Sequence, residues 1–208
     1  MRSRCPESAV TITGIRTKRA VAWLHQHGAE YGLDTGMIVS AGESAGGFLS
    51  LMLACTPGDP FFQPGFESID TRLQGCISLY EPNDLLGEHG CFDAKTYQEF
   101  NLKHVMPIAA DEDPELWRRC SPMYRLNSDM PPVFILGGTH DPLASVEESR
   151  QLSAAIKSVS HSAVVSAIYP NTTHAFDQTR SSRSIPTMQA LLQFMNWVRD
   201  SSPARGGT

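Results

Sequence analysis

Short apolar runs alternate with helix-like segments along this chain of 208 residues. Strands that are buried on both faces have such nearly continuous apolar runs, and they belong to parallel sheets covered by helices. The pattern therefore predicts an α/β protein with a mainly parallel sheet of about four strands flanked by helices. The runs that carry this prediction are 37–42, 75–80, 132–138 and 163–170.

The segments between the runs carry helix signals. Ser145 and Glu148 stand at the spacing of a capping box, which predicts the start of a helix there. The residues AVTIT at 9–13 are β-branched in part and suggest a further short strand. In the first helix, an apolar face is expected to run through Ala20, Trp23, Leu24 and His27. Besides the helix at Ser145, helices are predicted over 16–30, 47–55 and 186–199.

One long stretch, 82–128, interrupts the alternation because it has no strand signal. It contains two short helix candidates: one spans 93–105, and the other opens at Asp113-Pro114-Glu115, where proline follows an N-cap residue. We interpret 82–128 as a helical, cap-like insertion within a single domain that covers 1–208. The polar tail after about residue 200 is expected to be loose.

Composition excludes several classes of protein. Asp and Glu number 22 against 17 Lys and Arg, a net charge of −5, which weighs against a nucleic-acid binder. The longest apolar run, 48–55, falls far short of the roughly 20 residues that span a bilayer. Five cysteines without a C-x-x-C pair predict free thiols in a reducing, cytoplasmic compartment and no zinc site. No apolar segment follows the basic start, so we expect no signal peptide.

The hexapeptide GESAGG at 42–47 is the most informative motif, because it places G-x-S-x-G between a predicted strand and a predicted helix. A nucleophile elbow occupies this position in hydrolases. The tight turn strains the backbone of Ser44 and leaves no room for side chains at Gly42 and Gly46. The following helix start supplies free N–H groups, and the N–H of Ala45 is the candidate oxyanion donor.

A serine hydroxyl needs a histidine base and an acid that orients the base. Asp141 follows the strand 132–138 and His174 follows the strand 163–170, so both emerge at the sheet edge that presents Ser44. Three other acids are weighed against Asp141: Asp84 is a weaker rival, Glu147 lies inside a helix, and Asp177 shares the loop of His174. Glu43, beside the nucleophile, is assigned no chemical role.

The remaining histidines show no spacing typical of metal ligands, and no phosphate-binding or dinucleotide motif is present. His140 adjoins the proposed acid but is interpreted as a loop residue that points elsewhere. No metal and no cofactor are therefore expected. The other histidines are His25, His27, His89, His104 and His161.

Together these residues resemble the hormone-sensitive-lipase branch of the α/β-hydrolase carboxylesterases. The resemblance runs over about residues 16–200 and is carried by segments 19–34, 38–54 and 56–80, by GGTHDPLAS and by NTTHAFD. It implies that Ser44 is the nucleophile, Asp141 the acid and His174 the base. The implied reaction is hydrolysis of a carboxylic ester through an acyl-enzyme, without a cofactor.

The chain departs from that branch in two respects. It has no H-G-G-G loop to supply further oxyanion donors, and the several strands that the branch places before the elbow are missing. The strand 37–42 is therefore expected to be an exposed edge that favours homo-oligomers.

We expect an esterase for small to medium acyl esters. The alternatives are a truncated relative that is weakly active or inactive, and a small-molecule-binding protein on the same scaffold. A thioesterase or acyltransferase would use the same three residues.

Overall fold

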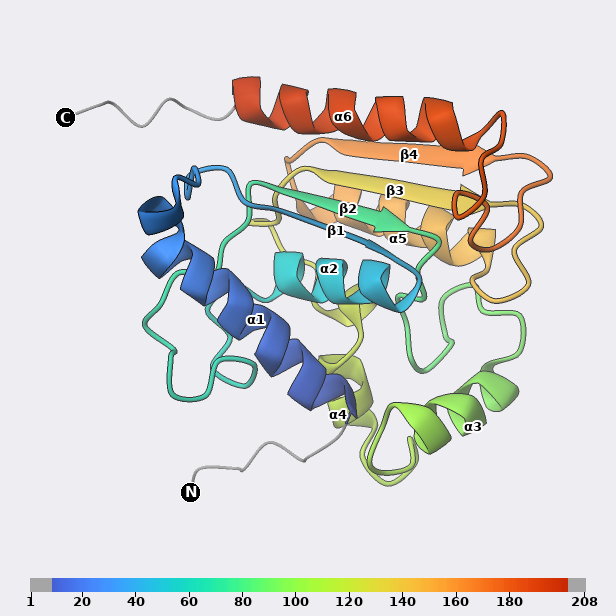
Figure 1. Cartoon of the computed structure of the whole chain (residues 1–208). Coiled ribbons are helices and arrows are strands. Elements are labelled where there is room, and N and C mark those ends of the chain that lie inside the picture. Colours follow the sequence, from blue (N-terminus) through green and yellow to red (C-terminus); the bar gives the residue numbers. More distant parts are fainter. Residues whose placement is uncertain (1–8, 202–208) are drawn as a thin grey trace.

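The computed structural model describes residues 9–201 (Figure 1). The expected loose tail and the start of the chain, where a signal peptide was sought, lie largely outside these residues. Within them the strands are β1 (Val39–Glu43), β2 (Gly75–Leu79), β3 (Val133–Gly138) and β4 (Val164–Tyr169). The helices are α1 (Ala9–His27), α2 (Ala45–Cys55), α3 (Ala94–His104), α4 (Pro114–Arg119), α5 (Val146–Val159) and α6 (Ser184–Ser201), with short 3₁₀ turns η1 (Gly28–Tyr31) and η2 (Pro122–Tyr124).

The four strands form one parallel sheet in the order β1-β2-β3-β4, so their order in space follows their order in the chain. Val39 pairs with Gly75, and Val133 pairs with both Cys76 and Val164. This confirms the predicted fold class. Because the strands are parallel, their carboxyl ends lie at one edge, where the arrowheads in Figure 1 point. The loops at that edge carry the candidate active site.

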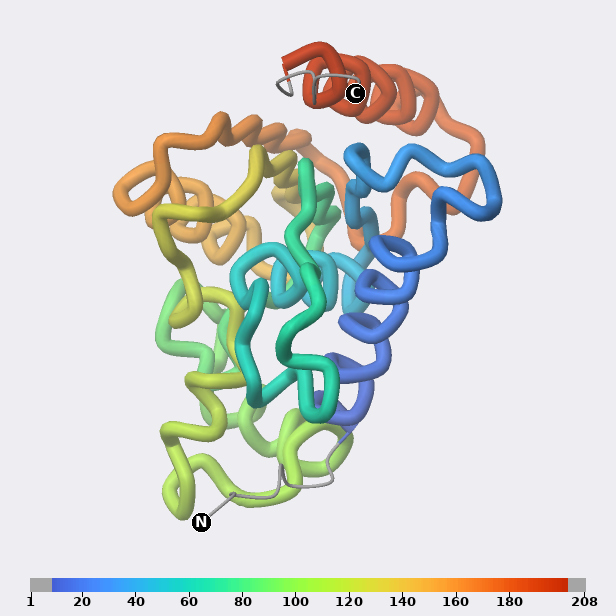
Figure 2. Tube along the Cα trace, turned by 90° about the vertical axis from the view of Figure 1, so that its left-hand side faces the viewer, coloured from blue at the N-terminus to red at the C-terminus, as the bar shows by residue number. Residues whose placement is uncertain are grey.

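Alternate side chains of the central strands enter two separate apolar cores. The larger core contains Cys76, Val133 and Ile135 with side chains of α1, α2, α4 and α5. The smaller core contains Ile77 and Leu136 with the inner side of α6. Figure 2 shows α6 on one side of the sheet and α1 and α2 on the other. The central strands are thus buried on both faces, as their unbroken apolar runs predict.

Two local predictions about the first helix are wrong. The segment 9–13 is not a strand, because it forms the first turns of α1, where buried Val10 packs into the larger core. Tertiary burial overrides the β preference of its branched residues. The predicted apolar face is also misplaced, because Trp23 is 44% exposed while Val21 and Ala22 are buried.

The stretch 82–128 has the two predicted helices and no strand within the described part of the chain. Asp93 caps α3, and Asp113 caps α4 by accepting a hydrogen bond from the N–H of Leu116. Trp117 of α4 is fully buried in the larger core, which anchors the stretch to the body of the protein. That the stretch is a cap-like insertion within a single domain stays a prediction.

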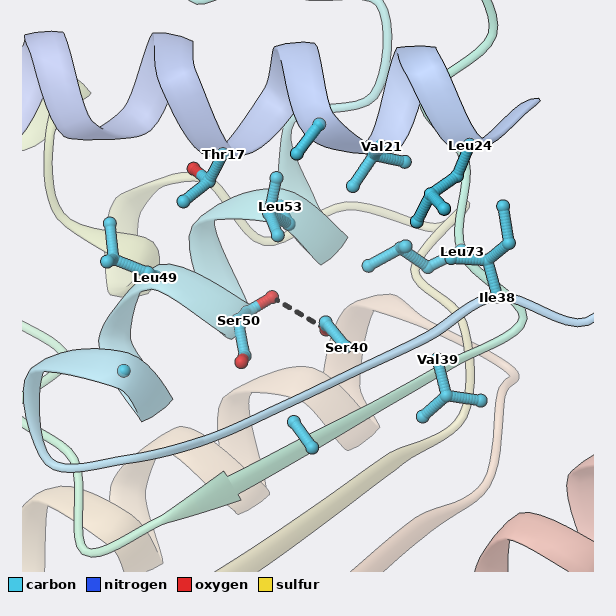
Figure 3. Close-up of a pocket in the computed structure, with 13 residues that line it drawn as sticks. Thr17, Val21, Leu24, Ile38, Val39, Ser40, Leu49, Ser50, Leu53 and Leu73 are labelled. Atoms are coloured by element: carbon cyan, nitrogen blue, oxygen red, sulfur yellow. Dashed lines mark hydrogen bonds between the residues drawn. The ribbon is translucent and has the colours of Figure 1, made fainter. Parts of the chain in front are cut away.

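β1 is an edge strand, as expected, because β2 is its sole partner in the described sheet. A cavity of about 350 Å³ lies beside it, between α1, α2 and β1 (Figure 3). The cavity is mostly apolar, and the hydroxyl of Ser40 donates a hydrogen bond to the Ser50 carbonyl in its wall. None of Ser44, Asp141 and His174 lines it. Self-association through this edge stays a prediction.

Candidate active site

Ser44 stands at the turn between β1 and α2 and has φ of 54° and ψ of −120°, a conformation that non-glycine residues rarely adopt. Such strain is typical of a nucleophile elbow. A Cβ at position 42 would lie 2.3 Å from the main chain of Gly46, so Gly42 permits the turn.

The motif alone did not indicate that Gly47 is sterically required. A Cβ there would lie 2.8 Å from the hydroxyl of Ser78 and 3.0 Å from Cβ of Glu81, so only glycine lets α2 approach β2 this closely. At Gly46, by contrast, a Cβ would meet no atom within 4 Å outside its own helix. The steric requirement therefore falls on Gly42 and Gly47 rather than on Gly42 and Gly46.

The three side chains selected from the sequence meet at the carboxyl edge of the sheet. Nε2 of His174 lies 2.9 Å from Oγ of Ser44, and Nδ1 of His174 lies 2.7 Å from Oδ2 of Asp141. A carboxylate only accepts hydrogen bonds, so Nδ1 carries the proton and Nε2 accepts from the serine hydroxyl. The imidazole thus has the tautomer that a general base requires.

Asp141 is held in place by its own loop. Its side chain is fully buried, and Oδ1 accepts hydrogen bonds from the N–H groups of Leu143 and Ala144 at 2.8 and 2.9 Å. One carboxylate oxygen is therefore fixed by the main chain, and the other faces His174. This arrangement restrains the carboxylate without a positively charged side chain.

The rival acids have other partners. Asp84 accepts hydrogen bonds from three main-chain N–H groups and from His89 and Tyr124. Glu147 is half exposed on α5, and Asp177 accepts a 2.6 Å hydrogen bond from the Tyr80 hydroxyl.

Glu43 is an exposed residue, and its charge acts on nearby Tyr80. The carboxylate that contacts His174 is therefore that of Asp141, and the three rival acids have other partners.

The other histidines are dispersed. Nε2 of His25 contacts the carbonyl of Arg72, His27 pairs with Glu30, and His140 lies beside the Thr139 hydroxyl. Among residues 9–201, no group of three or more His, Cys, Asp and Glu side chains is arranged to hold a metal ion.

A buried polar cluster behind the elbow also escaped the sequence analysis. Ser78, Glu81 and Asn83 follow one another at the end of β2, and Glu148 faces them from α5. Both carboxylate oxygens of Glu81, both side-chain polar atoms of Asn83 and one oxygen of Glu148 lack a hydrogen bond of acceptable geometry. Ser145 caps α5 by accepting a hydrogen bond from the N–H of Glu147, and the Glu148 side chain points into the buried cluster instead of completing a capping box.

Burial changes the ionisation of these acids. It raises the pKa of the Glu81 carboxyl to about 7, although the neighbouring Ser78 hydroxyl opposes the change. Burial, assisted by the negative charges of Asp84 and Glu81, raises the pKa of Glu148 to about 8. Near neutral pH the Glu148 carboxyl is therefore mostly protonated, and the Glu81 carboxyl is protonated in part.

The parallel sheet, the elbow and the edge at which the three side chains meet define an α/β-hydrolase fold. Comparison with known proteins agrees. The chain superimposes on an esterase, Est2, from Thermogutta terrifontis with a TM-score of 0.71 at 23% identity, covering 96% of this chain and 68% of that one. A truncated carbohydrate esterase from gut microbiota gives a TM-score of 0.71 at 18% identity, over 88% of this chain and 67% of that one.

Residues 11–156 match the protein family described as BD-FAE, and the chain belongs to that family. A probable carboxylic ester hydrolase, LipM, from Mycobacterium tuberculosis is 36% identical over 189 residues, which are 87% of this chain and 42% of LipM. The esterase LipQ from the same organism is 34% identical over 196 residues, 94% of this chain and 46% of LipQ. The chain thus spans less than half the length of these relatives.

Proposed function

We propose that this protein hydrolyses carboxylic esters with small to medium acyl groups, using Ser44 as nucleophile, His174 as base and Asp141 as the acid that orients the base. The observation that carries the proposal is the unbroken chain of hydrogen bonds, 2.9 Å from Ser44 to His174 and 2.7 Å from His174 to Asp141. The names of the relatives LipM and LipQ support the same reaction class.

In this mechanism Oγ of Ser44 attacks the ester carbonyl carbon while Nε2 of His174 takes the hydroxyl proton. The imidazolium is stabilised by Asp141 and then gives its proton to the departing alcohol, which leaves an acyl group on Ser44. Water, deprotonated by His174, attacks this acyl-enzyme and releases the carboxylic acid. The chemistry needs no cofactor.

The negative charge on the carbonyl oxygen needs hydrogen-bond donors in the transition state. The N–H of Ala45, at the first residue of α2, is the donor that we assign, because a helix start has free N–H groups and a partial positive charge. Removal of one such donor typically lowers turnover by about 10²- to 10³-fold.

Thioester hydrolysis and acyl transfer would use the same residues and differ only in the leaving group or the acceptor. A purely ligand-binding role on this scaffold has less support, because such a role needs no histidine in hydrogen-bond contact with Ser44. No helix within residues 9–201 has the length and apolar character to cross a bilayer. A cytoplasmic location rests on the free thiols of Cys55, Cys76 and Cys91 and stays a prediction.

Labelling with a fluorophosphonate, which reacts with activated serines, tests the proposal. We expect the wild-type protein to be labelled at Ser44 and to hydrolyse p-nitrophenyl acetate, and Ser44→Ala to lose both activities. Ser40→Ala is the matched control, since its hydroxyl bonds the Ser50 carbonyl in the wall of the cavity. Labelling that persists in Ser44→Ala would exclude the assignment.

A further inference from the structure

Tyr80 contacts the loop that carries His174, in addition to the contacts that His174 itself makes with Ser44 and Asp141. Tyr80 follows β2 and is 2% exposed. Its hydroxyl donates a 2.6 Å hydrogen bond to Oδ1 of Asp177, three residues beyond His174. The hydrogen bond therefore joins the far side of the His174 loop to the end of a central strand.

The ring of Tyr80 also contacts the imidazole directly. The two ring centroids lie 4.8 Å apart with an interplanar angle of 65°, an edge-to-face arrangement, and Phe176 approaches the same ring at 6.0 Å. Aromatic contacts of this type favour one mutual orientation of the rings. The Tyr80 ring thus contacts the imidazole in addition to the two hydrogen bonds that His174 makes with Ser44 and Asp141.

The local backbone is strained at both ends of this contact. Tyr80 has φ of 41°, and Ala175, next to His174, has φ of 55°. Non-glycine residues keep such values only where the surrounding contacts fix them. Before His174 the loop is fixed by the N–H of His140, which donates to the carbonyl of Thr172. After His174, the hydrogen bond from Tyr80 to Asp177 ties the loop to the strand end, beside the contact of Phe176 with the Tyr80 ring.

The tyrosine hydroxyl keeps its proton under all ordinary conditions. Burial is the main cause of a strongly raised pKa of Tyr80, and the carboxylates of Asp177 and Glu43 raise it further. Tyr80 is therefore a donor throughout the pH range of ester hydrolysis, and a hydrogen bond to a carboxylate is stronger than one between neutral groups.

We propose that Tyr80 and Asp177 are positioning residues, whose hydrogen bond holds the His174 loop so that the imidazole stays in contact with both Ser44 and Asp141. This inference rests on the proposed function. The pair does not touch the reacting atoms, so its effect should fall on the rate of acylation rather than on substrate affinity.

The test compares Tyr80→Phe, which removes only the hydroxyl, with Asp177→Ala, which removes the acceptor. Each should slow fluorophosphonate labelling and lower kcat by about 10-fold, with KM unchanged. The double variant should be no slower than either single variant, because each single substitution already removes the hydrogen bond between Tyr80 and Asp177. Asp177→Asn keeps an acceptor oxygen and should recover most of the rate.

Tyr124→Phe is the matched control. Its hydroxyl also donates to a carboxylate, that of Glu88 at 2.5 Å, but in the stretch 82–128. We expect its labelling rate and kcat to equal those of the wild type. An equal loss of rate in this control would show that any tyrosine–carboxylate bond has the same effect and would overturn the inference.

A proton NMR signal supplies a readout independent of activity. The proton on Nδ1 of His174, shared with Asp141 at 2.7 Å, should give a downfield resonance that broadens in Tyr80→Phe but not in Tyr124→Phe. If the wild type is not labelled at Ser44, the proposed function fails while this resonance still reports on positioning. If the wild type is labelled and Tyr80→Phe has the same rate and the same resonance, the positioning role is refuted.

Discussion

The buried carboxyl of Glu81 predicts a specific dependence of stability on pH. The side chain is fully buried behind the elbow, and burial raises its pKa from the ordinary 4.5 to about 7. Folding therefore binds a proton that the unfolded chain has already released in this range. The stability that the protonated group contributes is complete below about pH 4.5 and is lost as the pH rises through about 7.

The magnitude follows from the difference between the two pKa values. A difference of one unit between the pKa values of the folded and unfolded states corresponds to about 1.4 kcal/mol. Ionisation of Glu81 therefore lowers the free energy of unfolding by roughly 3 kcal/mol. This is a substantial part of the roughly 5–15 kcal/mol that stabilises most domains. Glu148, whose pKa is about 8, continues the decline toward higher pH in the wild type.

Glu81→Gln removes the titration and keeps the shape of the side chain. We expect its free energy of unfolding, relative to the wild type, to rise by roughly 3 kcal/mol between about pH 5 and about pH 8. Urea titrations at several pH values measure this change, with the fluorescence of buried Trp117 contributing to the signal. Glu147→Gln is the control, because that side chain is half exposed. Parallel curves for the wild type and Glu81→Gln would refute the reasoning.

Three further predictions concern the site and the sheet edge. Asp141→Asn should lower kcat about 10⁴-fold, whereas Glu147→Gln should leave it unchanged and Asp84→Asn should act mainly on stability; an equal catalytic loss in Asp84→Asn with unchanged stability would move the acid to that position. Gly47→Ala should destabilise the protein by about 1–3 kcal/mol in urea unfolding, while Gly46→Ala should be neutral or stabilising; equal effects would contradict the close approach of α2 to β2. Pairing of two copies through β1 predicts dimers that increase with concentration in analytical ultracentrifugation, and a monomer at all concentrations would exclude it.

The sequence predicted most elements of the sheet layer because apolar runs and glycine–proline breaks are local signals. The elbow at Ser44 followed from the G-x-S-x-G motif between a strand and a helix. The loops of Asp141 and His174 followed from the rule that parallel strands end at a common edge. The failures arise where long-range packing decides. Residues 9–13 became helix because Val10 packs into a distant core, and Gly47 matters only because β2 lies against α2.

The buried carboxyls were beyond sequence reasoning for the same reason. Glu148 follows Ser145 at capping spacing, and nothing local shows that its side chain turns inward toward Glu81. Likewise, the closeness of Asp177 to His174 in the sequence makes it a rival of Asp141, but its carboxylate accepts a hydrogen bond from the Tyr80 hydroxyl. The partner of a loop carboxylate depends on which strand end the loop reaches, and the sequence does not contain that information locally.

The strand order β1-β2-β3-β4 determines how late in folding Ser44 and His174 can come into contact. Ser44 follows β1 and His174 follows β4, 130 residues apart, so their contact forms only when these strands of the described sheet have assembled. During synthesis the serine emerges long before its base, and a half-finished chain holds an inert hydroxyl. Contacts between such distant residues are also among the slowest to form in folding. From the proposed function we therefore expect Ser44 to become reactive toward a fluorophosphonate only late in folding, which labelling at successive times after dilution from urea would measure.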